Sequence, residues 1–288
     1  MTGAGHGSAE PWHSQDAHVV RLDWGPTGAE ALTRYAVASG VAVIAVVIDV
    51  LSFTTCVSVA ADAGITVHPF RWNDGSATAL AEQLGATLAV PRSQARAAAT
   101  GPRGPARGAR LAAPISLSPS SIRQAAGITE IVLPSPNGST ISQLLADVGV
   151  QVVAASLRNR SAVARWIVAQ LVAARGRPAA VVVVPAGERW SDGSLRPAVE
   201  DLWGAGAVIS SLVGRLEHQA GPLLLSPEAA AAVSAWQAVE GDLGAALPLT
   251  ASGRELLDQG WHDDVAIAAE LDSSTVVPTL RDGAYRPA

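Results

Sequence analysis

Two short segments of the sequence are apolar at every position, residues 41–48 and 181–184. A strand with one solvated face alternates apolar and polar residues, whereas a strand that is covered on both faces is apolar throughout. Both segments are much shorter than the roughly 20 apolar residues that a membrane-spanning helix needs. The chain is therefore expected to fold around a central sheet with helices on both faces, and it is not expected to cross a membrane.

Further short apolar segments alternate along the chain with segments of helical periodicity. This alternation predicts an α/β fold in three layers, α/β/α, with a largely buried central sheet. We expect one continuous architecture, and the pattern is also compatible with two similar halves. Strands are expected at 18–23, 41–49, 65–70, 86–90, 130–134, 151–155 and 180–186. Helices are expected at 28–38, 53–63, 75–84, 119–126, 138–148, 159–175, 198–217, 227–238 and 252–270, the last with a break near Gly260.

The composition excludes several classes of function. The net charge is −5 and the pI is about 5.7, so a broad surface for nucleic acid is not expected. A single cysteine, Cys56, excludes an internal disulfide. All 20 basic residues are arginine. A chain without lysine can form neither the P-loop phosphate site nor a pyridoxal Schiff base.

Two regions differ from the alternating pattern. Residues 1–17 have no basic start and no apolar core, so we expect a disordered tail rather than a signal peptide, and a cytoplasmic protein with one domain over 18–288. The segment 92–117 combines arginines with a stretch rich in Gly and Pro and contains no acid, so a flexible loop is expected. This loop is either a solvated linker or a positively charged flap over an anionic substrate.

The first candidate site follows the apolar segment 41–48. Asp49 stands between that strand and the next expected helix, where open α/β sheets bind their ligands. A carboxylate in this place can hold a divalent cation or act as a nucleophile or base. The hydroxyls of Ser52, Thr54 and Thr55 either contact a phosphate at the helix N-terminus or only cap the helix.

The second candidate is the turn between the strand at 130–134 and the helix at 138–148. Asn137, Gly138 and Ser139 open a helix whose first N–H groups have no acceptor within the helix. Such groups can seat an anion, and a glycine lets the backbone approach a phosphate closely. The alternative is a simple capped turn.

The third candidate follows the strand at 180–186. Glu188 comes soon after this strand, and Glu200 and Asp201 fall in the first turn of the next helix. Successive helical residues diverge by about 100°, so at most one of the pair can reach a shared metal ion while the other caps. Compensation of the helix macrodipole is the alternative for both. A further acidic group at 262–264 is expected to form an exposed polar face rather than a metal site.

In this order the motifs resemble those of the 2-phosphosulfolactate phosphatase (ComB-like) family, from about Val19 to Pro287. The similarity passes through Asp49-Val50-Leu51, Thr54-Thr55, Ser118-Pro119, Pro136-Asn137-Gly138-Ser139, Ser156-Leu157-Arg158-Asn159, Glu200-Asp201, Ser252-Gly253-Arg254-Glu255-Leu256 and Asp263-Asp264-Val265-Ala266. The resemblance implies a magnesium-dependent phosphatase. Its reaction would remove the phosphate of 2-phosphosulfolactate, a step toward coenzyme M.

Together with this resemblance, the candidate residues lead to a specific hypothesis. The protein is expected to hydrolyse the phosphate monoester of a small anionic organic acid, 2-phosphosulfolactate or a relative. Mg²⁺ is expected on Asp49 and Asp201, with Glu200 or Glu188 assisting, and Asp49, Asp201 and Glu200 are the candidate catalytic residues. The candidate substrate-binding residues are Ser52, Thr54, Thr55, Arg92, Asn137, Gly138, Ser139 and Arg158.

Three positions depart from the family's pattern. Ser52 stands where the family has arginine, and Leu117 stands where it has asparagine. Pro91 replaces the acid of a Glu-Arg pair, which leaves Arg92 as the candidate for its arginine. The alternative function is therefore a non-catalytic relative that binds a small anion or serves as an assembly partner. A homo-oligomer is compatible with either function.

Overall fold

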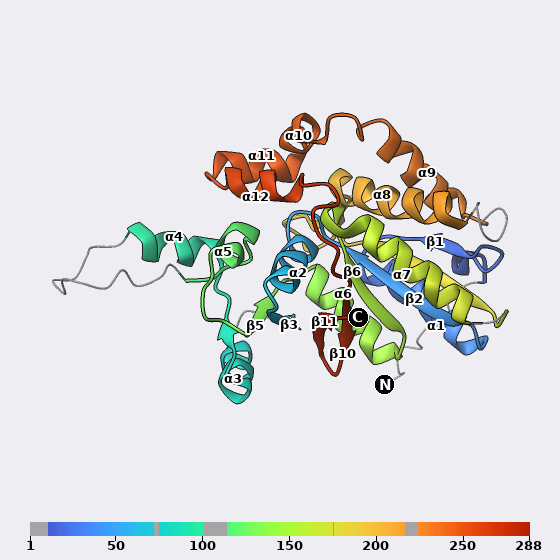
Figure 1. Cartoon of the computed structure of the whole chain (residues 1–288), viewed down its shortest axis with the longest axis horizontal. Coiled ribbons are helices and arrows are strands. Elements are labelled where there is room, and N and C mark those ends of the chain that lie inside the picture. The colour runs from blue at the N-terminus through green and yellow to red at the C-terminus, as the bar shows by residue number, and fades with distance from the viewer. Residues whose placement is uncertain (1–10, 72–74, 101–113, 175, 217–223) are drawn as a thin grey trace.

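Figure 1 shows the protein as a computed structural model, which describes residues 11–71, 75–100, 114–174, 176–216 and 224–288. The strands are β1 (Val20–Leu22), β2 (Ala42–Ile48), β3 (Thr66–Phe70), β4 (Thr87–Leu88), β5 (Glu130–Pro134), β6 (Gln151–Ala155), β7 (Ala179–Pro185), β8 (Glu188–Arg189), β9 (Leu195–Arg196), β10 (Pro278–Arg281) and β11 (Ala284–Pro287). The α-helices are α1 (Gly25–Ala38), α2 (Phe53–Asp62), α3 (Gly75–Leu84), α4 (Arg92–Thr100), α5 (Pro119–Arg123), α6 (Gly138–Val148), α7 (Arg160–Ala173), α8 (Val199–Leu216), α9 (Pro227–Gln237), α10 (Leu243–Ala246), α11 (Ala251–Asp258) and α12 (His262–Ala268). Three short 3₁₀ helices are η1 (Pro11–Ser14), η2 (Leu157–Asn159) and η3 (Leu247–Leu249).

The main sheet has the strand order β1-β7-β2-β6-β10-β11-β3-β5-β4. The strands β1, β7, β2 and β6 form one parallel group, and β3, β5 and β4 form a second. The antiparallel hairpin β10–β11 lies between the two groups. In the first group Ile48 is paired with both Ala155 and Pro185, so the carboxyl ends of three strands lie side by side.

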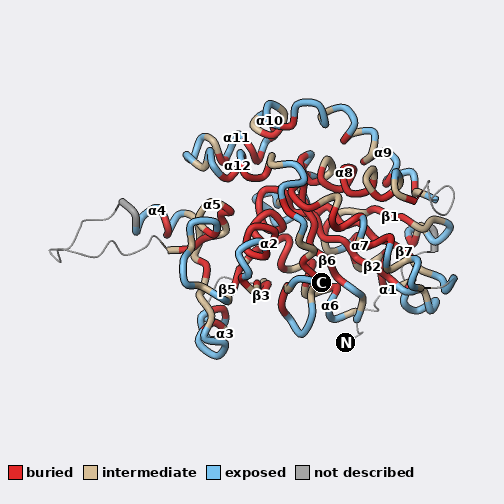
Figure 2. The backbone as a smooth tube through the Cα atoms, viewed as in Figure 1, coloured by how far each residue is buried: buried red, intermediate tan, exposed pale blue. Residues whose placement is uncertain are grey.

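Helices cover both faces of the sheet, as the all-apolar strands predict. Alternate residues of β2 point to opposite faces: Val46 packs in one hydrophobic cluster with α7, α8 and α9, and Val47 packs in the other with α1, α2 and α6. Figure 2 shows the buried residues gathered in the sheet and on the helices around it. Each fully buried valine of these strands contributes about 1.5–3 kcal/mol, so the two clusters hold β2 in the centre of the fold. The three-layer α/β/α prediction is confirmed.

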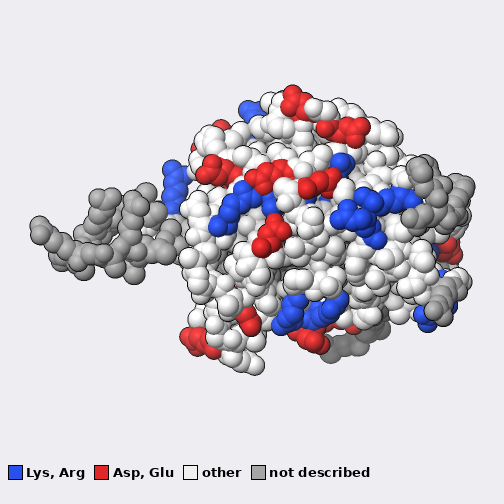
Figure 3. All heavy atoms as spheres, in the orientation of Figure 1, with Lys and Arg blue, Asp and Glu red and all other residues white. Residues whose placement is uncertain are grey.

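The expected elements agree closely with the observed ones from 41 to 90 and from 130 to 238. The helix expected at 252–270 is interrupted near Gly260, as expected, and forms α11 and α12. Within the described ranges, every helix is too short or too polar to cross a bilayer. On the face shown in Figure 3, acidic and basic side chains lie next to one another.

The structure corrects the expectation for the arginine-rich segment 92–117. Residues 92–100 form the helix α4, because alanine and arginine are both strong helix formers. Ser116 then pairs with Val90, and Pro119 opens α5 behind the capping residue Ser118. The Gly- and Pro-rich stretch that suggested a loop, 101–113, lies outside the described residues.

Two hairpins and one folded segment were not expected from the sequence. The β10–β11 hairpin turns at Asp282 and Gly283, which both have positive φ; an Asp-Gly pair is a strong signal for such a turn. The β8–β9 hairpin is short and polar, so it has no apolar pattern to reveal it. At the N-terminus, residues 1–10 of the expected tail lie outside the described residues. The adjoining η1 is folded, and the Ser14 side chain is buried.

Candidate active site

Asp49 lies at the carboxyl end of β2 with 6% of its surface exposed. Its Oδ1 atom accepts a hydrogen bond from the Phe53 N–H at 2.9 Å, which caps the start of α2. Its Oδ2 atom accepts one from the Gly138 N–H at 3.0 Å, at the start of α6. The carboxylate therefore joins the ends of three elements, and it is a helix cap at the same time as it is a candidate ligand-binding group.

Gly138 is a position where only glycine fits. A Cβ atom on this residue would lie 2.8 Å from Oδ2 of Asp49 and would collide with the ring of Phe53. The glycine is expected from the sequence to admit a phosphate, but the group that approaches its backbone is the carboxylate of Asp49. The glycine thus serves the position of Asp49 directly.

The preceding residue, Asn137, also contacts an acid. Its Nδ2 atom donates to Oε2 of Glu188 at 3.0 Å, which links the β5–α6 turn to the hairpin after β7. Glu188 and Asn137 come from candidate sites that are 51 residues apart in the sequence. The structure therefore brings the first, second and third candidate sites together into one place.

Asp201 holds the backbone next to Asp49 and Glu188 in position. Its Oδ1 atom accepts the Val50 N–H at 2.7 Å, and its Oδ2 atom accepts the Gly187 N–H at 2.9 Å. These bonds tie the chain after β2 to the chain after β7. Its neighbour Glu200 is 2% exposed and, as the helical geometry predicts, is not part of this clamp.

Four acidic side chains therefore lie near one another, of which Asp49, Glu200 and Asp201 are buried and Glu188 is half-buried. Burial raises the pKa of Asp49 to about 6 and that of Glu188 to about 7, with mutual repulsion adding to the shift of Glu188. Burial, followed by the charges of Asp49 and Glu200, raises the pKa of Asp201 well above its ordinary value. Because these shifts oppose ionisation, the cluster favours a bound cation or shared protons over four free negative charges.

Arg92 supplies positive charge to this acidic cluster from α4. Its Nη2 atom donates to Oγ of Ser52 at 2.6 Å and to Oδ2 of Asp264 at 3.1 Å, and the guanidinium lies 5.8 Å from the ring of Trp261. Its charge lowers the pKa of Asp49, against the larger effect of burial. Arg92 and Ser52 therefore both lie at the site, and the hydroxyl of Ser52 accepts a hydrogen bond from the arginine.

The expectation of an exposed polar face at 262–264 is confirmed for His262 and Asp263 and is wrong for Asp264. The side chain is fully buried, and its Oδ1 atom accepts hydrogen bonds from Oγ of Ser118 at 2.7 Å and from the Ser120 N–H at 3.1 Å. Asp264 therefore joins α12 to α5 and, through Arg92, to α4. Asp264 therefore positions Arg92. The amphipathic helical pattern around Asp264 did not indicate this role.

The other candidate hydroxyls are committed to the backbone. Thr54 and Thr55 donate to the carbonyl oxygens of Asp49 and Val50 at 2.8 and 2.7 Å, and Ser139 donates to that of Leu133 at 2.9 Å. All three donors are buried, and their hydroxyl protons are used within the protein. Their observed contacts shape the turns that carry Asp49 and Asn137.

Arg158 is placed in a different set of contacts. It forms ion pairs with Asp62 at 2.8 Å and with Glu270, and Arg123 binds the same Glu270 at 2.6 Å. The Arg158 guanidinium therefore connects α2 with the segment after α12, and the structure does not bring it to the acidic cluster.

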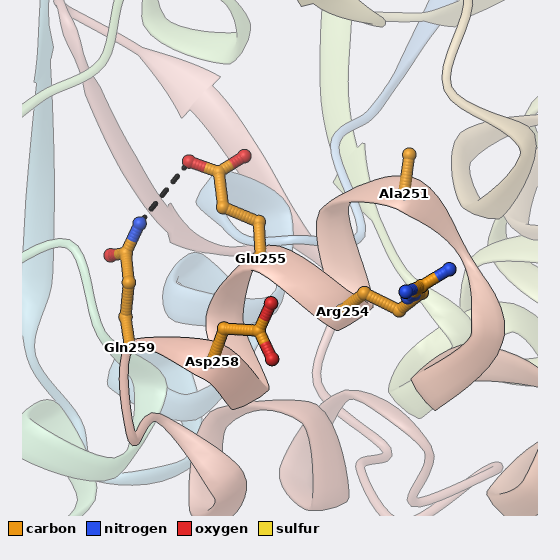
Figure 4. Close-up of a pocket in the computed structure, with 5 residues that line it drawn as sticks. All are labelled: Ala251, Arg254, Glu255, Asp258 and Gln259. Carbon is orange, nitrogen blue, oxygen red and sulfur yellow. Dashed lines mark hydrogen bonds between the residues drawn. The ribbon is translucent and has the colours of Figure 1, made fainter.

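A surface pocket near the C-terminal helices lies outside the acidic cluster. Figure 4 shows Arg254, Glu255, Asp258 and Gln259 projecting from α11 around it, with Gln259 donating to Glu255. These side chains are exposed, and the lining residues all belong to α11 or to the residue that follows it. The pocket lacks the buried, convergent polar groups that mark the acidic cluster.

The acidic cluster fits a magnesium ion by its chemistry. Its donors are carboxylate oxygens, and Mg²⁺ is commonly held by one or two carboxylates together with waters and substrate phosphate. Within the described ranges, three or more metal-ligating side chains do not converge closely enough to form a complete cage. Asp49 and Asp201 use both oxygens on backbone N–H groups, and each oxygen keeps a second lone pair.

Sequence reasoning missed two residues around the cluster, Asp264 and Arg196. Asp264 lies within the similarity motif at 263–266, so the family pattern was the signal that could have identified it. Arg196 is directly opposite Glu188 in the β8–β9 hairpin, and its charge lowers the pKa of that acid against the larger effect of burial. No pattern in the sequence indicates this short hairpin.

Comparison with known protein families gives a match over most of the chain. No curated protein matches the chain. The family model described as 2-phosphosulpholactate phosphatase matches residues 32–283, a range that contains every residue of the acidic cluster together with Arg92 and Asp264. The match covers most of the 288 residues, and its family consists of phosphoric monoester hydrolases. The chain belongs to the 2-phosphosulpholactate phosphatase family.

Proposed function

We propose that this protein uses Mg²⁺ to hydrolyse the phosphate monoester of a small anionic organic acid, 2-phosphosulfolactate or a close relative. The observation that carries the proposal is the buried carboxylate of Asp49, which is fixed by two backbone N–H groups beside Glu188, Glu200 and Arg92. Buried acids with raised pKa values at the ends of parallel strands are typical of catalytic sites.

Asp49 is the first residue that would hold the metal ion, with Glu200 as a second carboxylate and with waters and the substrate phosphate as the remaining ligands. When bound, Mg²⁺ supplies a Lewis acid that polarises the phosphoryl group. Asp201 serves a positioning role in this proposal, because its two oxygens hold the N–H groups of Val50 and Gly187. This division follows the helical geometry, which turns neighbouring side chains of α8 in different directions.

The remaining groups act on the substrate. Arg92, held by Ser52 and Asp264, binds phosphate oxygens through its planar guanidinium. The N–H groups of Ser139 and Thr140 have no acceptor inside α6, so they are available to the phosphate at the helix start.

Proton transfer can be assigned to Glu188. A carboxyl with a pKa of about 7 is partly protonated at neutral pH, so it can give its proton to the leaving oxygen as the P–O bond breaks. A water molecule completes the hydrolysis, either by attacking phosphorus directly or by releasing the phosphate from a carboxylate. If 2-phosphosulfolactate is the substrate, the product sulfolactate leads toward coenzyme M, as the resemblance implies.

The test is a phosphate-release assay with Mg²⁺ across sulfonated and carboxylated phosphate esters, with 2-phosphosulfolactate included. We expect release from at least one ester, loss of release with EDTA, and loss of release in Asp49→Asn with the protein still folded. The matched control is Asp258→Asn on the exposed face of α11. Anion binding without turnover of any ester would instead identify a non-catalytic relative.

A further inference from the structure

The β8–β9 hairpin carries an arginine that faces the acidic cluster. Glu188 and Arg196 are directly opposite in the antiparallel register. Side chains of a directly opposed pair project from the same face of a hairpin, so Arg196 lies on the side from which Glu188 contacts Asn137. The turn of this hairpin is closed by the bond from the Trp190 N–H to the Ser194 carbonyl at 2.9 Å.

The guanidinium of Arg196 is oriented but not neutralised. It lies 5.8 Å from the ring of Trp190, and Nη2 donates to Oγ of Ser252 on α11 at 3.4 Å. In the part of the chain that the structure describes, no carboxylate forms an ion pair with Arg196 within 4.0 Å. Arginine has five N–H donors, so most of them remain for water or a ligand.

Arg92 and Arg196 occupy similar positions relative to the acids. Each guanidinium lies over a tryptophan ring, Arg92 over Trp261 and Arg196 over Trp190. Arg92 lowers the pKa of Asp49, and Arg196 lowers that of Glu188. The acidic cluster thus has one oriented arginine from α4 and a second from the hairpin. Arg92 is already bound to Asp264, whereas Arg196 has no acidic partner among the described residues.

A substrate with two acidic groups needs both kinds of position. Its phosphate must approach the metal-binding carboxylates. Its second anionic group is repelled by the same carboxylates and needs a positive charge to bind. The planar fork of arginine matches the oxygens of a carboxylate or a sulfonate. Trp190 is 58% exposed, so the ligand can reach the guanidinium from solvent along the face of the ring.

We propose that Arg196, oriented by Trp190 and Ser252, binds the second anionic group, a carboxylate or sulfonate, of the phosphate ester. This assignment rests on the proposed function and adds the residue that selects dianionic acids over simple phosphate esters. It makes Arg196 a specificity-determining residue.

The test compares 2-phospholactate with isopropyl phosphate, which replaces the carboxylate with a methyl group. Arg196→Gln should raise KM for 2-phospholactate about tenfold, because a charge-assisted contact of this kind is worth that much. The same variant should leave KM and kcat for isopropyl phosphate within about twofold. Arg177→Gln, an exposed arginine before the opposite end of β7, is the matched control and should change neither substrate. Equal effects of Arg196→Gln on both substrates, or no effect on either, would overturn the assignment.

A second measurement separates this assignment from the phosphatase proposal. Sulfolactate carries a carboxylate and a sulfonate but no phosphate, so its binding can be followed by titration calorimetry without turnover. We expect Arg196→Gln to weaken this binding about tenfold relative to wild type and to Arg177→Gln. If no ester is hydrolysed but this difference is found, the phosphatase proposal fails and the anion site stands. Equal binding by the variant and the wild type, or no binding by the wild type, refutes the site.

Discussion

The Oδ2 atom of Asp49 accepts the N–H of Gly138 at 3.0 Å, although 89 residues separate the two in the sequence. The bond fixes the carboxylate that ends β2 to the residue that begins α6. Both groups are buried, and a buried N–H that loses its acceptor costs about 1–3 kcal/mol. Catalytic geometry and fold stability are therefore coupled at this contact.

Gly138→Ala should damage the site through this contact. The added Cβ would collide with Phe53 and lie 2.8 Å from Oδ2 of Asp49. We expect a loss of unfolding free energy of roughly 1–3 kcal/mol, as is usual for an overpacked core, with a larger proportional loss of phosphate release. Urea unfolding followed by fluorescence gives the first quantity, and the phosphate assay gives the second.

The matched control is Gly244→Ala in α10, where an added Cβ would meet no atom within 4 Å. Alanine is the better helix former, so this variant should be as stable as the wild type or slightly more stable. If Gly138→Ala behaves like Gly244→Ala, the close approach of Gly138 to Asp49 does not exist in solution.

The sequence predicts which residues follow the ends of the strands, but it does not predict which of their side chains meet. The short apolar segments predict the strands that precede Asp49, Asn137 and Glu188, so the sequence indicates that these residues follow strand ends. Whether the side chains meet depends on crossovers and twist, which the pattern does not encode. Asp264 shows the limit most clearly, because its neighbours His262 and Asp263 are exposed while its own side chain is buried and accepts a hydrogen bond from Ser118 on a distant part of the chain.

The β8–β9 hairpin, which carries Glu188 and Arg196, could not be predicted for a different reason. The β8–β9 hairpin is two short strands of charged and polar residues, and neither alternation nor apolar runs mark them. Arg158, which lies in one of the motifs of the resemblance, is a candidate substrate-binding residue from the sequence. Its actual partners, Asp62 and Glu270, are 96 and 112 residues away, and local sequence carries no information on such pairs.

Stability without metal should depend on pH through Glu188. The pKa of this acid is raised from about 4.5 in the unfolded chain to about 7 in the fold, so the folded protein keeps a proton that the unfolded chain has released. Its contribution to stability is complete below pH 4.5 and is lost as the pH rises through about 7. Asp49, with a pKa raised to about 6, acts in the same direction.

Glu188→Gln should remove the part of this dependence that comes from Glu188. In EDTA at pH 8 we expect the variant to be more stable than the wild type by on the order of 2 kcal/mol, and near pH 4.5 the two should be equal. Urea unfolding across this range measures the difference. Glu255→Gln, on the exposed face of α11, should follow the wild type at every pH. A wild type that is equally stable at pH 5 and pH 8 would contradict the buried acidic cluster.

Asp264→Asn should release Arg92 from its position. The substitution removes the charge that holds Nε and Nη2 of Arg92 at 3.3 and 3.1 Å, and it leaves Ser118 Oγ and the Ser120 N–H with a weaker acceptor. We expect a loss of about 2 kcal/mol in unfolding free energy, less than for a fully buried pair because Arg92 is partly exposed.

Activity should show that Asp264 acts through Arg92. Arg92→Gln and Asp264→Asn should each raise KM for the same ester, and the double variant should raise it little further, since both remove one oriented guanidinium. The control pair is Arg160→Gln with Asp272→Asn, an ion pair at 3.0 Å that lies outside the acidic cluster and should affect stability alone. Additive effects of Arg92→Gln and Asp264→Asn on KM would show that the two residues act independently.

Mg²⁺ should bind to the acidic cluster with modest affinity, because a few carboxylates leave several metal-bound waters in place. Binding relieves the repulsion among the carboxylates, and it should be stronger at pH 8 than at pH 6, because protons on Asp49 and Glu188 oppose Mg²⁺ binding at the lower pH. Titration calorimetry after EDTA treatment measures the affinity, and the melting temperature should rise as Mg²⁺ is added to the wild type. Glu200→Gln should weaken binding about tenfold or more, whereas Glu255→Gln should bind as the wild type does. No heat and no thermal shift at pH 8, even with inorganic phosphate present, would mean that the cluster holds protons rather than a metal ion, and the magnesium-dependent mechanism would fail.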